Sequence, residues 1–539
     1  MSGKKVIVYL LSCILIVICA LSGCGKDDGS GYIFKTNISS NPQNLDPQLA
    51  SDKASLMIIE NMYRGLFKMR ADGSVESDVV SDYQVSEDGY TYTFELKNDV
   101  YWSGKNEYEA PLTAYDFEYA FKRIYDDSTN SPYKETYKSI KNADAINKGV
   151  KSKDELGVKA LDDTTLVIEL EYPYYNFLQL LTLTAAYPCN EDFFVSTKGK
   201  YGLSPDDCIS DGAFYIKEWN YDPYWDNNYI IMKRNQKNSE NDRVYPLGLN
   251  FFIKDESENI SDYKNGSIDC IISDDYSQLA DISSVMSKQT KYSGIMFNTK
   301  STCFSNIILR KALAYSLDRT ELSDAMPKGF VSANSIIPEG VTVMNKSVRD
   351  LIPESDYNLF DENAARKLWI GELSKMDVAS LDGLSIMVND NYEGKDVIKN
   401  IAEQWQINLN FLCSVEIVSD KEYNDRLKTG DFDMTVVEVN NSVNNVSDCF
   451  GQFVTGDSRN ILDYYNSDLE YAVRNIEMST SLNDAVKYIQ MAEEAVNEDA
   501  SYVPVAFSDT YFFVNKDAED VSYNAFTEQI DFSKAKMFD

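Results

Sequence analysis

The sequence contains no histidine. This absence excludes Ser-His-Asp and Cys-His catalytic arrangements, histidine-ligated zinc and iron sites, and acid–base catalysis by imidazole. G-x-S-x-G, G-x-G-x-x-G and Walker A motifs are also missing, as is the spacing of an EF-hand calcium loop. With 86 acidic residues in the chain, adjacent carboxylates arise readily and do not indicate a glycosidase pair. We therefore predict that the protein is not an enzyme and needs no cofactor or metal.

Basic residues are scarce relative to acidic ones. The 539 residues include 51 Lys and Arg against 86 Asp and Glu, which gives a formal net charge of −35. Nucleic-acid binding is excluded as a function, because contact with phosphates needs clustered cations. Only 25 Gly and 13 Pro are present while 43% of residues are apolar, so the composition is that of a folded chain.

Long hydrophobic runs are confined to the N-terminus. Lys4 and Lys5 precede an apolar run over residues 6–21, broken only by Ser12 and too short for a membrane span. The run ends in Leu-Ser-Gly before Cys24, which resembles the bacterial lipobox. We expect a signal peptide over residues 1–23, a lipidated Cys24, and a tether over residues 24–31. An ordinary signal peptide with an incidental cysteine is the alternative. The lipobox interpretation predicts an exported protein that is lipid-anchored at the outer, extracytoplasmic face of the cell membrane.

Six cysteines follow Cys24: Cys189, Cys208, Cys270, Cys303, Cys413 and Cys449. No two of them form a C-x-x-C pair, so the sequence does not support a zinc ribbon or a thioredoxin-like site. An even number of cysteines outside the cell permits disulfides, and buried free thiols are equally compatible with the sequence.

Strand and helix patterns alternate along the rest of the chain. Polar and apolar residues alternate over 91–96 and 165–171, as in half-buried strands. Helix starts are indicated at Thr113, with a capping box, and at Ser305 and Asp361. The remaining predicted elements are a helix around Trp405, strands over 383–389, 411–418 and 432–439, a helix over 484–497 and a strand over 502–507. This interleaving predicts α/β lobes rather than a sandwich or a helical bundle.

Nine short segments carry a family resemblance, in the same order as in that family and over nearly all of the chain after residue 31. They are 41–47 (NPQNLDP), 60–67 (ENMYRGLF), 88–97 (DGYTYTFELK), 113–117 (TAYDF), 211–215 (DGAFY), 297–299 (FNT), 309–319 (LRKALAYSLDR), 430–434 (GDFDM) and 531–535 (DFSKA). Together they resemble the extracellular solute-binding proteins of family 5, the oligopeptide- and dipeptide-binding lipoproteins of ABC importers.

The resemblance implies a two-lobed, periplasmic-binding-protein-like α/β fold with a hinge of two crossings. Lobe 1 would comprise residues 32–291 plus 500–539, with an extra subdomain over about 63–186, and lobe 2 would comprise residues 292–499. The crossings would lie near residues 292–298 and 499–505. The implied function is to enclose a peptide between the lobes and deliver it to the permease subunits of an importer, without chemistry. We expect a monomer.

The chain departs from the family after the strand at 432–439. Peptide binders of the family commonly carry there an acidic residue that can hold the peptide α-amino group. In this sequence the run is EVNNSVNNV over 438–446, and the acidic position falls on Ser442. Glu438 or Asp448 could take the place of this missing acidic residue. The resemblance marks Glu438, Asn440, Asn441 and Ser442 as ligand-binding candidates, although the asparagine-rich run can equally be a plain loop.

A second candidate region follows the LDP motif. In resembling proteins this stretch pairs with the ligand backbone like an added β-strand, which suits variable ligands. Ser51 and Lys53 are therefore further candidates. Lys53 could face a ligand carboxylate, although a lone lysine is more commonly solvated.

Two other functions remain open. Tyrosine clusters such as Tyr172, Tyr174 and Tyr175 would also suit an oligosaccharide or another non-peptide solute, although most tyrosines will be packing residues. A lipid-anchored hydrolase is the other alternative. It is suggested by three short motifs: K-T-G at 428–430, S-x-N at 442–444 and S-x-x-K at 131–134. Its motifs stand in the wrong order, because the S-x-N should precede the K-T-G.

The lipid anchor can be tested with Cys24→Ala. This variant lacks the only thiol at the end of the apolar run, so we expect it to be released or to keep its signal peptide. Metabolic labelling with palmitate and fractionation of membranes measure both effects. Cys19→Ala, within the apolar run, is the matched control and should label normally. Normal acylation of Cys24→Ala would end the lipobox assignment.

Overall fold

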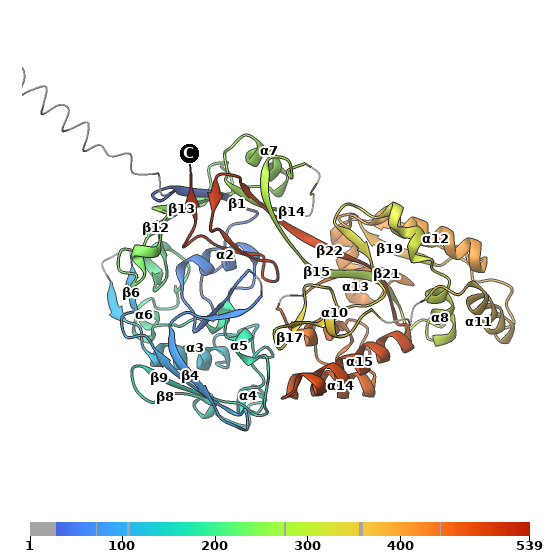
Figure 1. The fold of residues 1–539 in the computed structure, drawn as a ribbon, viewed down its shortest axis with the longest axis horizontal. Coiled ribbons are helices and arrows are strands. Elements are labelled where there is room, and N and C mark those ends of the chain that lie inside the picture. Colours follow the sequence, from blue (N-terminus) through green and yellow to red (C-terminus); the bar gives the residue numbers. More distant parts are fainter. Residues whose placement is uncertain are drawn as a thin grey trace, which may run out of the picture.

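The computed structural model describes residues 29–538 except 72, 105–107, 274, 275, 277, 355–358 and 442. Cys24 and the predicted signal peptide lie outside these residues. The chain forms two lobes of mixed α/β structure, one containing the N-terminal and C-terminal segments and the other the segment between them (Figure 1). The predicted two-lobed α/β fold is confirmed.

The first lobe is built on a four-stranded sheet. Its strand order is β1 (Ile33–Ile38), β13 (Gly248–Ile253), β12 (Tyr229–Arg234) and β11 (Phe214–Asn220), with β1 parallel to β13 and the other pairs antiparallel. Helix α2 (Lys53–Met62) contacts the C-terminal hairpin of β24 (Ser522–Asn524) and β25 (Gln529–Asp531). The first lobe is therefore formed by both the N-terminal and the C-terminal segments of the chain.

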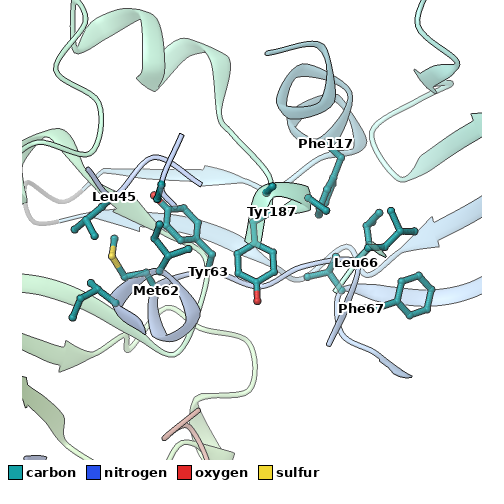
Figure 2. Packing of buried hydrophobic residues seen from close by; sticks show 14 of the residues in the cluster. Leu45, Met62, Tyr63, Leu66, Phe67, Phe117 and Tyr187 are labelled. Atoms are coloured by element: carbon teal, nitrogen blue, oxygen red, sulfur yellow. The ribbon is translucent and has the colours of Figure 1, made fainter. Parts of the chain in front are cut away.

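A second sheet in this lobe is antiparallel throughout. It runs β4 (Val80–Val85), β5 (Thr91–Leu96), β9 (Thr165–Glu169) and β8 (Val158–Ala160). Helix α3 (Ala114–Ile124) packs on it and begins with the predicted capping box at Thr113 and Asp116. Figure 2 shows Phe117 of this helix in the same cluster as Leu66, Phe67 and Tyr187. The two sheets therefore share one continuous core.

The lobes are joined by two long strands. β15 (Ser283–Phe297) and β22 (Tyr502–Asn515) pair antiparallel along most of their lengths and run from one lobe into the other (Figure 1). The seven-stranded sheet they form has the order β14 (Cys270–Ser273), β22, β15, β21 (Met434–Asn440), β19 (Ser385–Asn389) and β20 (Ser414–Val418), with β16 (Phe330–Ser332) on β22. A Cβ at Gly294 would lie 2.4 Å from the Val503 carbonyl oxygen, so this crossing needs glycine.

Helices pack around the second lobe's part of this sheet. α8 (Ile307–Tyr315), α11 (Glu362–Lys375) and α12 (Lys395–Leu409) share a core around Trp405. α14 (Ser467–Met478) and α15 (Leu482–Asp499) cover a separate core around Phe453. Short elements complete the fold: α4 (Ala143–Asn147), α5 (Phe177–Leu180), α6 (Glu191–Ser196), α7 (Asn259–Lys264), α9 (Arg319–Leu322), α10 (Val348–Leu351), α13 (Asp420–Thr429), β2 (Phe67–Met69), β3 (Val75–Ser77), β6 (Tyr101–Gly104), β7 (Glu109–Pro111), β10 (Ile209–Ser210), β17 (Thr342–Val343), β18 (Lys346–Ser347), β23 (Ala518–Glu519) and β26 (Lys536–Met537).

Several element boundaries differ from the sequence prediction, and three of them have an identifiable physical reason. Helix α8 is capped by Asn306, whose side chain accepts from the Ile308 backbone, instead of Ser305. β20 starts at Ser414 instead of residue 411, because Phe411 packs its ring 5.1 Å from that of Trp369. β22 continues to Asn515 instead of ending at 507, since its second half pairs with β14 and β15 in the first lobe.

The six cysteines after Cys24 are free thiols in the structure, and all but the half-buried Cys303 are buried. Within the described part of the chain, no helix is both long and apolar enough to cross a membrane.

Helix α2 carries a buried carboxyl group. Glu60 lines a cavity of about 60 Å³ and accepts a 2.8 Å hydrogen bond from the Tyr187 hydroxyl. Burial, reinforced by the charge of Asp531, raises the pKa of Glu60 from 4.5 to about 7. At intermediate pH the folded protein therefore keeps a proton that the unfolded chain has lost.

This pKa predicts a pH-dependent effect of Glu60→Gln. As pH rises from 4.5 through 7, the unfolded state binds fewer protons than the folded state, so the free energy of unfolding falls. The glutamine cannot ionise and still accepts from Tyr187. We expect it to stabilise the protein by about 3 kcal/mol at pH 8 and to have little effect at pH 4.5. Urea unfolding at the two pH values measures the difference.

Glu76→Gln is the matched control for this prediction. Partial burial acts against ionisation of Glu76, but pairing with Arg70 and Lys68 leaves its pKa lowered. Neutralising it should therefore give no gain at pH 8. An equal gain from Glu60→Gln at both pH values would contradict the assigned pKa.

Candidate functional site

The predicted ligand-binding residues lie on two elements that approach each other from different lobes. Ser51 and Lys53 flank Asp52, which caps α2 by accepting from the Ser55 backbone. Glu438 and Asn440 lie near the end of β21, and Asn441 follows it. Ser442 lies outside the described residues.

Glu528 joins residues from both elements, and the sequence analysis did not identify it. Lys53 forms an ion pair with its carboxylate, and the Asn440 side-chain amide donates to it at 3.2 Å. The Lys291 ammonium, on β15, lies 3.8 Å from the same carboxylate. The Glu528 side chain is only 9% exposed, whereas that of Lys53 is 79% exposed. Two of the predicted residues are therefore brought together through a third.

A cavity of about 400 Å³ lies beside this cluster. Lys53, Lys291 and Glu528 line it, together with residues of β1, α7, β14 and β22. Its volume is within the range of small-molecule sites. Among the predicted residues that the structure describes, Lys53 lies on its wall.

Ser51 and Glu438 are exposed. Glu438 stands opposite Ser293 in the ladder of β15 and β21. Strand β19 pairs with β21 only at Met434 and Thr435, so among the described residues the β21 edge beyond Thr435 has no strand neighbour on that side. A strand edge without a neighbouring strand can accept an extended backbone.

Asn441 is fully buried and serves the fold directly. Its side-chain amide donates to the Thr290 carbonyl oxygen at 2.8 Å, at the point where the register of β15 against β22 shifts. Its side-chain oxygen is buried and has no hydrogen-bond partner among the described residues. These contacts fasten the end of β21 to the hinge strand.

The asparagine-rich run continues into a contact between the lobes. The Asn445 amide donates to the Tyr174 hydroxyl at 2.8 Å, and the Tyr175 hydroxyl donates to the Asn445 side-chain oxygen at 3.2 Å. The Asn444 amide donates to the Gly73 carbonyl oxygen at 3.3 Å. Asn444 and Asn445 are buried, so this part of the run is an interface and not a solvated loop.

Burial affects the ionisation of two groups near this interface. Burial raises the pKa of Glu477, on α14, although Lys138 and Arg474 act in the opposite direction. Burial also raises the pKa of Tyr174 well above its ordinary value. Asp448, proposed as a substitute for the missing carboxylate, lies 2.8 Å from Arg459.

The described residues also show where the hydrolase motifs and possible metal ligands lie. In the described residues no group of three or more Cys, Asp or Glu side chains could hold a metal ion. Ser131 of the S-x-x-K motif donates to the Gln48 carbonyl oxygen within the first lobe, whereas Thr429 of K-T-G ends α13 in the second. Among the described residues, the S-x-x-K and K-T-G motifs therefore lie in different lobes and are not assembled into one site.

Comparisons with known proteins agree with this geometry. The chain is 28% identical over 428 residues to the oligopeptide-binding protein OppA of Bacillus subtilis (strain 168), covering 76% of this chain and 75% of that protein. It is 24% identical over 534 residues to the dipeptide-binding protein DppE of the same organism, covering 93% and 94%. The solved structure of Listeria monocytogenes OppA bound to peptide matches the fold with a TM-score of 0.72 at 23% identity, covering 94% of this chain and 99% of that one.

A family model describes the same relationship. The model of the bacterial extracellular solute-binding proteins, family 5 Middle, matches residues 74–460, which is well over half of the chain. The chain belongs to the bacterial extracellular solute-binding proteins of family 5.

Proposed function

We propose that this protein captures a peptide between its two lobes and delivers it to the permease subunits of an ABC importer. The observation that carries the proposal is the convergence of Lys53, Asn440 and Lys291 on Glu528, beside a cavity of about 400 Å³. These residues come from the first lobe, the second lobe and the hinge strand. A solute held there would contact both lobes at once, which favours closure.

The peptide class is supported by two further features. The relatives named above bind oligopeptides or dipeptides, as their names state. The edge of β21 near Glu438 and Asn440 has no strand neighbour among the described residues, and Ser51 is exposed just before α2, so a peptide backbone could lie between them. Backbone pairing of this kind tolerates variable side chains.

The remaining parts of the proposal follow the sequence. Cys24 would hold a monomer at the outer face of the cell membrane by its lipid, with no cofactor. Lobe 1 would comprise residues 32–291 and 500–539, with the subdomain near 63–186, and lobe 2 residues 292–499. Ser51, Lys53, Glu438 and Asn440 would face the solute, while Asn441 would hold β21 in position. Ser442 stays a candidate from the sequence alone.

Native mass spectrometry of the form that begins after Cys24 tests the ligand class. We expect a series of co-purified masses that resolve into short peptides after denaturation. A single carbohydrate or other non-peptide mass would overturn the peptide assignment while leaving the fold intact. If the protein purifies without a ligand, titration with mixed peptides and with oligosaccharides distinguishes a peptide ligand from a non-peptide one.

The contact between the lobes predicts the effect of Tyr174→Phe. Losing the hydroxyl removes the acceptor for the Asn445 amide, so the closed form is stabilised less. One buried hydrogen bond corresponds to about a fivefold weaker affinity for peptides, mainly through faster release. Calorimetry with a mixed pentapeptide library and stopped-flow release measure these effects.

Tyr172→Phe is the matched control, since its ring lies 6.5 Å from that of Tyr174 in the same cluster. It should bind peptides as the parent protein does. Equal affinities for Tyr174→Phe and the parent would show that this contact does not contribute to closure.

A further inference from the structure

The charged residues around the large cavity are not equivalent. Three glutamates and two lysines line it: Glu256, Glu393, Glu528, Lys53 and Lys291. Glu393 is exposed, whereas the Glu528 side chain is 9% exposed. We propose that Glu528 binds an ammonium group of the peptide, which takes the position that the Lys53 ammonium occupies in this structure. This inference rests on the proposed function.

The present partner of Glu528 is easily displaced. The side chain of Lys53 is 79% exposed, and ion pairs with such an exposed partner contribute little stability because water competes for them. A ligand ammonium would meet the same largely buried carboxylate, and charge-assisted hydrogen bonds to a carboxylate are strong. Exchange of one ammonium group for the other therefore loses little.

Glu528 is held in place by backbone and side-chain contacts that do not involve its carboxylate. It lies in the turn between β24 and β25 with a left-handed φ of 54°. In this turn the Asn524 side-chain oxygen accepts from the Phe526 backbone at 3.0 Å. The hairpin is fixed to α2, because the Asn61 amide donates to the Ile530 carbonyl oxygen at 2.8 Å. The carboxylate is thus positioned before any solute arrives, which limits the entropy lost on binding.

Polar groups with unmet hydrogen-bonding capacity share the cavity wall. Thr510 lines the cavity and is 1% exposed, and its hydroxyl has no hydrogen-bond partner among the described residues. Asn37 also lines the cavity, and its buried side-chain oxygen likewise has no hydrogen-bond partner among the described residues. Buried polar atoms are normally satisfied, so these two leave hydrogen-bonding capacity unused beside the cavity.

Other nearby carboxylates are less suited to this role. Asp448 is already paired with Arg459 at 2.8 Å, and Glu438 is exposed to water on its strand. Glu528 alone among these three contacts Asn440 of the second lobe and lies near Lys291 on the hinge strand. Binding at this carboxylate would therefore be sensed by both lobes.

Three synthetic pentapeptide libraries test the assignment. The first has a free amino terminus and no lysine, the second is the same library N-acetylated, and the third is N-acetylated with one lysine. The parent protein should bind the first at least tenfold more tightly than the second. Glu528→Gln should lower affinity for the first about tenfold and leave the second unchanged. If the parent protein binds the third library and Glu528→Gln does not, a lysine side chain can also supply the ammonium group.

Glu519→Gln is the matched control, an exposed carboxylate in the same C-terminal segment, and should match the parent protein. Equal losses for the free and acetylated libraries in Glu528→Gln would overturn the proposal and leave Glu528 as a tie between the lobes. A parent protein that binds free and acetylated libraries equally would overturn it while the peptide function stands. Binding of none of the three libraries would overturn the peptide function and the assignment with it.

Discussion

The antiparallel ladder of β15 and β22 is the constraint on which the rest of the structure depends. Each lobe has its own core, and these two strands carry the chain between them. The register shifts at Thr290, and such a bulge redirects the side chains that follow it. Beyond it, Lys291 pairs with Asn440 in the β21 ladder, while the Thr290 carbonyl oxygen accepts the Asn441 amide. One irregularity in the hinge thus fixes the end of β21 and places Lys291 beside Glu528.

The contact between the lobes combines apolar and polar groups: Met69, Tyr175 and Phe526 of the first lobe pack with the second lobe's core, and asparagines form hydrogen bonds across it. Asn444 and Asn445 meet tyrosines and backbone of the first lobe through hydrogen bonds that water can replace when the lobes separate. A large apolar interface would hold the lobes closed irrespective of a solute. Gly73 permits this approach, because a Cβ there would lie 2.6 Å from the Asn444 amide nitrogen. The closed form can therefore be stabilised by a solute in the cavity instead of by the interface alone.

Local patterns in the sequence predicted most of the elements, because the alternation of polar and apolar residues and the capping of helices depend on residues that are neighbours in the sequence. The capping box at Thr113, the N-cap at Asp361 and the strand Thr91–Leu96 all occur as expected. Errors arose where tertiary contacts decide, as at Phe411, which packs between two tryptophans instead of entering β20. Of the candidate site, Lys53 and Asn440 were brought together, but Asn441 proved to be a buried anchor, which its neighbours in sequence do not reveal.

Glu528 shows why the rest of the site could not be predicted. It is separated from Lys53 by 475 positions and lies in a turn, where an acidic residue is ordinary. Only the fold places that turn against α2 and within reach of β21. The location also bears on Ser442, at which the family resemblance implied a carboxylate from the second lobe. A carboxylate supplied by the first lobe can meet the same ammonium chemistry from the opposite wall. On our proposal the serine marks a different arrangement of the charge, and peptide binding would not require an acidic residue at that position.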